Sequence, residues 1–170
     1  MKQPQYPLQQ LAMIKDRRLE EAEKLLKEKK EILAKEESLL AKVEAERDKV
    51  KGHRLAKLTQ LREAMDSGEK TTKIQQMKQY LKLVDEQLRQ KEQKVTEQKK
   101  KVTEAKKQVE TARQNLLKRQ QDVEKLKIHR KEWEAGVLRE LERVESVEAD
   151  EMGTVRHTQQ KRERKKEKGS

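Results

Sequence analysis

The stretch that decides the fold is residues 74–144, which read IQQMKQYLKLVDEQLRQKEQKVTEQKKKVTEAKKQVETARQNLLKRQQDVEKLKIHRKEWEAGVLRELERV. Of the eleven positions spaced seven residues apart through this stretch, ten are apolar. The series is Ile74, Leu81, Leu88, Val95, Val102, Val109, Leu116, Val123, Arg130, Val137 and Val144. An apolar repeat of seven residues forms one seam along an α-helix, and that seam must be buried against another helix. The pattern therefore predicts a long coiled-coil helix.

The composition excludes an ordinary globular domain. Charged residues make up 45% of the chain and aromatic residues 2%, with no Phe and a single Trp. A globular core of this chain length needs aromatic side chains as fillers. Both prolines lie within the first seven residues, so little interrupts a helix after them. The composition and the repeat together predict an all-α coiled coil.

The sequence divides into two helices and a turn. Residues 8–66 carry apolar doublets seven residues apart, and Asp66-Ser67-Gly68 reads as a helix stop with Gly68 in the left-handed conformation. Thr72 is expected to cap the second helix, with Gln75 completing a capping box. The expected elements are a helix over 8–66, a turn over 67–71 and a helix over 72–147.

A short turn between long helices favours an antiparallel hairpin, here over residues 1–152. Folding at the turn pairs residues whose numbers sum to about 138, so that Val43 faces Val95. The alternative is a parallel dimer of one very long helix, and Gly68 and the Thr72 cap count against it.

The two seams do not match perfectly. Lys91, Gln98, Arg119 and Glu140 are polar members of the second seam, which predicts marginal stability.

Leu25, Ile32 and Leu39 form an apolar strip on the first helix that the second helix does not fully use. The strip is a candidate lateral docking surface, or it is covered by the stems of lysine and arginine side chains.

The chain offers no recognisable catalytic or metal chemistry. It has no cysteine, its three histidines cannot converge in such a hairpin, and it contains no glycine-rich phosphate loop. We therefore expect no enzymatic activity, cofactor, metal or small-molecule substrate. No apolar run is long enough to span a bilayer or to serve as a secretory signal, which favours a cytosolic protein.

The formal net charge is +12, and residues 156–168 alone contain seven Lys and Arg residues. Residues 153–170 lack apolar periodicity, so we expect a disordered basic tail. Without aromatic residues the tail offers no base stacking, so nucleic acid is not the expected partner. Binding to RNA or anionic surfaces through the tail would be nonspecific and salt-sensitive.

Three segments carry a resemblance to a known family. Residues 7–18 resemble the opening, residues 76–81 the tip region, and residues 147–151 with the basic tail the end of the bacterial type III secretion stalk proteins. This family includes FliJ of the flagellar system and YscO of the virulence systems, and the chlamydial members are the most similar. The resemblance covers nearly the whole chain.

The resemblance implies a cytoplasmic, non-catalytic stalk and adaptor at the inner-membrane secretion apparatus. The paired terminal ends of such a stalk enter a hexameric secretion ATPase, and its hairpin end reaches the export gate membrane protein. Secretion chaperones or a needle-length regulator are further implied partners, and the protein itself is expected to be a monomer.

The candidate binding residues follow from these roles. Tyr80 lies off the seam and is the preferred tip contact, and Trp133 is either an anchor for a partner or a packing partner of Leu8 or Leu11. The tip residues are Met77, Lys78, Tyr80 and Leu81, and the open-end residues are Arg130, Trp133, Val137 and Leu141.

Two other functions stay open at this point. The first is a basic coiled coil that binds RNA or anionic surfaces nonspecifically, which would lose affinity steeply with salt. The second is a structural spacer that self-associates, through Leu25, Ile32 and Leu39.

Overall fold

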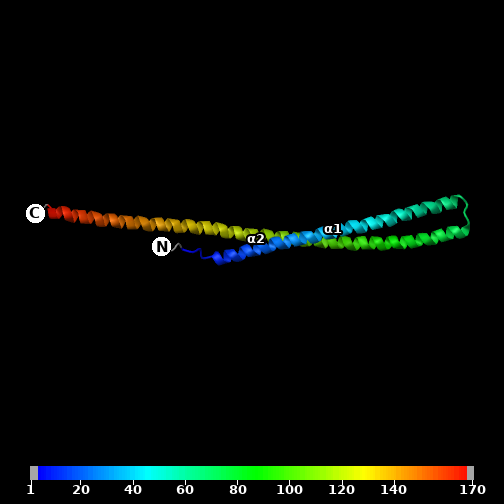
Figure 1. The fold of residues 1–170 in the computed structure, drawn as a ribbon, viewed down its shortest axis with the longest axis horizontal. Coiled ribbons are helices and arrows are strands. Elements are labelled where there is room, and N and C mark those ends of the chain that lie inside the picture. The colour runs from blue at the N-terminus through cyan, green and yellow to red at the C-terminus, as the bar shows by residue number, and fades with distance from the viewer. Residues whose placement is uncertain (1–3, 168–170) are drawn as a thin grey trace. The chain divides into compact units, whose positions relative to one another are not determined.

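The protein consists of two long helices in a computed structural model that describes residues 4–167. Helix α1 spans Gln9–Asp66 and helix α2 spans Thr71–Glu167, and residues 4–167 contain no strand (Figure 1). The expected all-α antiparallel hairpin is confirmed. The chain forms two units, which we call the turn unit, Glu20–Leu117, and the terminal unit, which comprises Met1–Leu19 and Lys118–Ser170.

The turn unit is a hairpin closed by a Schellman motif at the end of α1. Gly68 has φ +73°, its N–H bonds the carbonyl of Met65 at 3.3 Å, and the N–H of Glu69 bonds the carbonyl of Ala64 at 3.1 Å. These two bonds satisfy carbonyls that the helix end would otherwise leave open. The left-handed glycine expected from the sequence is confirmed.

The start of α2 differs from the expectation. The carbonyl of Lys70 accepts the N–H groups of Lys73 and Ile74 at 3.0 and 3.1 Å, so Lys70 occupies the N-cap position. Thr72 therefore lies inside the first turn of α2 and does not cap it. Four residues, 67–70, separate the two helices, and the Schellman motif takes up the first three of them, so α2 begins at Thr71.

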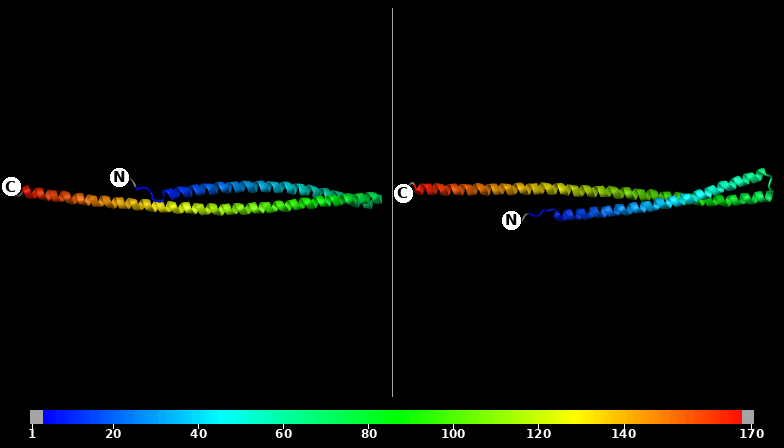
Figure 2. Two further views of the ribbon diagram at one scale, coloured as in Figure 1. Left: turned by 90° about the horizontal axis from the view of Figure 1, so that it is seen from below. Right: turned by 45° about the horizontal axis from the view of Figure 1, so that its top comes forward.

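The core of the turn unit is a narrow seam of small side chains. Val84 is 1% exposed, and Val95, Val102, Ala105 and Val109 are also buried along the same face of α2. Figure 1 shows α1 and α2 side by side in this unit, and the turned views of Figure 2 show them winding about each other. A valine and alanine seam lets the two backbones approach closely but buries little apolar area.

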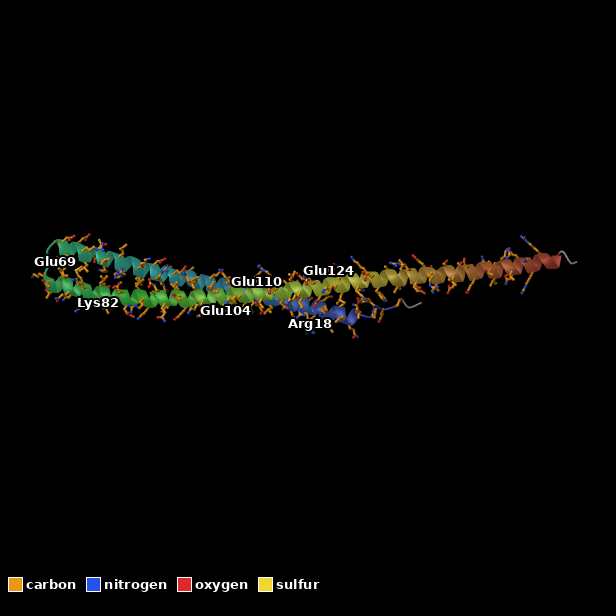
Figure 3. All side chains as sticks on the ribbon, turned by 180° about the vertical axis from the view of Figure 1, so that it is seen from behind. Arg18, Glu69, Lys82, Glu104, Glu110 and Glu124 are labelled. Carbon is orange, nitrogen blue, oxygen red and sulfur yellow. The ribbon has the colours of Figure 1, made fainter. Side chains whose placement is uncertain are left out.

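Polar contacts across the turn unit confirm its register. Lys91 donates to a carboxylate oxygen of Glu46 at 2.7 Å, and Lys29 donates to the amide oxygen of Gln108 at 3.0 Å. The residue numbers of each pair sum to 137, close to the expected value. Charged side chains such as Lys82 and Glu104 project from the outer surface of this unit (Figure 3).

Gln98 shows how the seam accommodates a polar residue. Its side chain is only 8% exposed, and its amide nitrogen donates to the backbone carbonyl of Glu36 at 3.1 Å and to the Glu36 carboxylate. A buried amide without partners would be costly, whereas these bonds satisfy it and favour one register.

The terminal unit pairs the start of the chain with α2. Lys15 donates to Asp122 Oδ2 at 2.7 Å, and these residue numbers again sum to 137. Val123 is buried beside this pair at 6% exposure.

Helix α2 is longer than expected, and this corrects two expectations at once. It does not end near Val147 but continues to Glu167, so residues 153–167 are helical rather than disordered. A helix that is already nucleated by packing extends through good helix formers at little cost, and this segment is rich in Arg, Lys, Gln and Glu. The remaining tail residues, 168–170, lie outside the described residues.

Candidate partner-binding sites

The open-end residues meet the start of the chain at a tyrosine. Tyr6 is only 6% exposed, and its hydroxyl lies 2.7 Å from His129 Nδ1 in a hydrogen bond. The ring of Trp133 meets the Tyr6 ring edge to face, with the centroids 5.4 Å apart. The Arg130 guanidinium lies 5.7 Å from the centroid of the same ring. We call Tyr6, His129, Arg130 and Trp133 the tyrosine clamp.

The clamp explains why the chain before α1 is held against α2. An aromatic pair in this geometry contributes about 0.5–1.5 kcal/mol beyond its burial, and the hydroxyl bond contributes about 1 kcal/mol more. Trp133 makes a packing contact with the start of the chain, and the ring that it meets is that of Tyr6, which was not predicted from the sequence. The sequence reasoning missed Tyr6, although the register places residue 6 opposite residues 129–133.

A surface hollow of about 570 Å³ lies beside the clamp. All four predicted open-end residues line it, together with Tyr6 and Leu138. Leu138 is 58% exposed and Leu141 is 39% exposed, so the hollow presents apolar side chains to solvent. We call this feature the terminal hollow, and its lining residues are Pro4, Gln5, Tyr6, Gln9, Arg130, Trp133, Glu134, Val137, Leu138 and Leu141.

The predicted tip residues divide into two kinds. Met77 and Leu81 are half-buried on the seam side of α2, whereas Lys78 and Tyr80 are exposed. The Tyr80 hydroxyl lies 3.0 Å from His53 Nε2, and Lys57 Nζ lies 5.7 Å from the centroid of the Tyr80 ring. Tyr80 is thus partly engaged with α1, which the sequence reasoning had not anticipated.

The turn itself carries a charged pair. Lys73 donates to Glu69 Oε1 at 2.7 Å, and this hydrogen bond together with the charge of Lys73 lowers the pKa of the Glu69 carboxyl. The same cause acts on the helix–helix contacts, where the hydrogen bond from Lys91 lowers the pKa of Glu46. In the terminal unit the hydrogen bond from Lys15 lowers the pKa of Asp122.

The predicted lateral strip is left uncovered in the turn unit. Leu25, Ile32 and Leu39 are 39%, 43% and 45% exposed. Each lies one residue before a half-buried seam leucine, so the strip borders the core without joining it.

Neither helix, within residues 4–167, has a stretch that is apolar enough over a sufficient length to cross a bilayer. The same residues contain no group of three or more His, Asp or Glu side chains arranged to hold a metal ion.

Comparisons with known proteins place the chain in a family. A comparison with curated proteins finds no match. The structure is similar to that of a protein described as a candidate YscO homologue, CT670 from Chlamydia trachomatis, with 42% sequence identity and a TM-score of 0.89. The similarity covers 94% of this chain and 98% of that one. The sequence model of the YscO-like protein family matches residues 3–163. The chain therefore belongs to the YscO-like family and is a helical protein associated with type III secretion.

Proposed function

We propose that this protein is a non-catalytic stalk and adaptor of a type III secretion system. In this role the paired terminal segments dock into a hexameric secretion ATPase, and residues near the turn contact the export gate membrane protein. The protein would work in the bacterial cytoplasm, at the inner-membrane face of the apparatus. Secretion chaperones or a needle-length regulator would be further partners.

The terminal hollow is the observation that carries this proposal. The hollow is lined by Tyr, Trp and Arg, the residue types in which partner-binding hot spots are enriched. Exposed leucines beside them add apolar surface that a partner can cover. Leu138 and Leu141 lie three residues apart on α2, so they share one face of the helix. A partner segment seated there would cover both of them.

The tyrosine clamp gives the hollow a fixed shape before any partner arrives. Tyr6 and Gln9 come from the N-terminal segment, and Arg130 and Trp133 come from α2. Because the hydroxyl bond and the ring contact hold these two segments together, less ordering entropy is lost when a partner binds. A preformed surface built from both terminal segments suits docking by the paired ends.

Beyond the hollow, α2 continues as an exposed helix. Arg156, Lys161, Arg162 and Arg164 are exposed on its last turns. This basic stretch is the observation that favours the competing function, nonspecific binding to anionic surfaces.

The test measures ATP hydrolysis and hexamer formation by the cognate secretion ATPase in the presence of this protein. Leu138→Asp places a charge in the hollow, and Leu83→Asp is the matched control, since Leu83 is 64% exposed on the same helix in the turn unit. We expect Leu138→Asp to weaken stimulation at least about tenfold and Leu83→Asp to leave it unchanged. A Trp133→Ala variant should fail in the same way as Leu138→Asp.

A truncation to residues 1–152 separates the two functions. We expect stimulation to survive this truncation, since the hollow stays intact. If the truncation abolishes all binding while Leu138→Asp has no effect, the basic helix end is the binding element and the stalk proposal is wrong.

A further inference from the structure

The outer face of α1 carries charges in a self-complementary order. Glu21, Glu28, Lys35 and Lys42 are spaced seven residues apart, and all four are exposed. The order is two acidic residues followed by two basic residues. This row lies within the turn unit.

The charge row runs beside the lateral strip. Leu25, Ile32 and Leu39 each precede a member of the row by three residues, and residues three apart are neighbours on one helix face. The three apolar side chains are 39–45% exposed. The face therefore carries one apolar and one charged position in every seven residues.

We propose that this face binds a second copy of the chain, with the two α1 helices antiparallel. If Ile32 meets Ile32 of the second copy, then Leu25 meets Leu39, and the apolar strips coincide. In the same register Glu28 lies against Lys35 and Glu21 against Lys42, and the two-fold axis repeats each pair. All four ion pairs then join opposite charges. The sequence predicted this face as a docking surface. The order of its charges now indicates that the partner is a second copy of the chain.

The charge row favours this arrangement over a parallel one. In a parallel two-fold pair the charge rows of the two copies lie on opposite sides of the apolar strips, so the ion pairs of Glu28 with Lys35 and of Glu21 with Lys42 do not form. An antiparallel contact with its two-fold axis across the helices is isologous, so the row of one copy meets the row of the other.

The dimer is weak and depends on concentration. Three partly exposed apolar side chains offer much less than the roughly 1,200 Å² that a stable protein–protein interface buries. Exposed ion pairs contribute specificity and orientation more than affinity. A single chain therefore prevails at low concentration, and the pair forms where the protein accumulates. This inference does not rest on the stalk role, and its test does not involve the ATPase.

The test is sedimentation equilibrium of the full chain between about 10 µM and 1 mM, a range suited to a small interface. We expect the wild type to dimerise reversibly in this range. Glu28→Lys and Lys35→Glu should each weaken the dimer about tenfold, because two symmetry-related pairs change sign. The equimolar mixture of these two variants should regain association, and so should the double variant with both changes.

Glu23→Lys is the matched control, since it makes the same charge change on an exposed residue that is neither three nor four residues from any member of the strip or the row. It should leave association at the wild-type level. A second measurement uses the absence of cysteine from the chain: Ile32→Cys should form a disulfide-linked dimer with itself, whereas Leu39→Cys should not. A wild type that stays monomeric to about 1 mM, or a mixture of Glu28→Lys and Lys35→Glu that fails to regain association, would overturn the proposal.

Discussion

Removing the Tyr6 side chain tests how the terminal hollow is built. Tyr6 is the only part of the tyrosine clamp that comes from the N-terminal segment, so Tyr6→Ala removes every clamp contact of that segment. Tyr6→Phe removes only the hydroxyl and its bond to His129. The two variants thus separate the ring contacts from the hydrogen bond.

The expected magnitude follows from the contacts. Burial of the ring contributes about 1.5–3 kcal/mol, the edge-to-face pair with Trp133 about 0.5–1.5 kcal/mol, and the hydroxyl bond about 1 kcal/mol. Loss of about 3 kcal/mol lowers the ratio of docked to undocked N-terminal segment more than a hundredfold. Loss of about 1 kcal/mol in Tyr6→Phe lowers it only about fivefold.

Trp133 supplies the assay because it is the only tryptophan of the chain. When Tyr6 leaves, the Trp133 ring becomes more accessible, so its emission should shift to the red and acrylamide should quench it faster. Hydrogen exchange at the first turns of α1 should speed up in parallel. Tyr80→Ala removes the other tyrosine and should leave Trp133 emission as it is in the wild type.

The reasoning is refuted if Tyr6→Ala leaves both the emission maximum and the quenching rate unchanged while circular dichroism shows the same helix content. The N-terminal segment would then not be docked against α2, and the hollow would lack one of its walls.

Two further predictions concern the stability of the hairpin. Hydrogen bonds from lysines lower the pKa of Glu46 below 4.5 and the pKa of Asp122 below 3.8. These carboxylates therefore stabilise the fold at a pH above 4.5 and 3.8, respectively. They lose this contribution as the pH falls through their lowered pKa values in the folded protein. Thermal unfolding followed by circular dichroism should therefore show a lower Tm at pH 2.5 than at pH 7, as long as the salt concentration is equal, and an unchanged or higher Tm would contradict these ion pairs. In urea unfolding, Gly68→Ala should destabilise the hairpin by about 1 kcal/mol because φ is positive at this residue. Gly52→Ala lies inside α1 and should stabilise the hairpin by about 0.5–1 kcal/mol. Equal effects of the two substitutions would rule out the left-handed turn.

The hairpin could be predicted because its causes are local and periodic. The seven-residue repeat determines which face of each helix is buried, and Gly68 marks the only break between the helices. The position of the break then fixes the register, which is why Lys91 and Glu46 lie where the numbering placed them. Exposure of Leu25 follows from the same geometry, since it lies one position off the seam.

The contacts that the sequence did not reveal lie outside this periodicity. Tyr6 precedes α1 in a segment without regular structure, so no repeat assigns its side chain a direction. The contact between His53 and Tyr80 joins two residues off both seams, where the lengths and rotamers of the side chains decide what meets. The length of α2 was underestimated because an apolar pattern reports burial, whereas a nucleated helix continues without burial.

The measurement that tests the proposed stalk most directly is site-specific photocrosslinking in a mixture of this protein, the cognate secretion ATPase and the export gate protein. A photoreactive residue replaces Leu138 in the terminal hollow in one variant, and Leu83 in the turn unit in the other. We expect the probe at residue 138 to crosslink to the ATPase and the probe at residue 83 not to do so. Crosslinks to the ATPase from residue 83 and none from residue 138 would contradict docking through the terminal hollow.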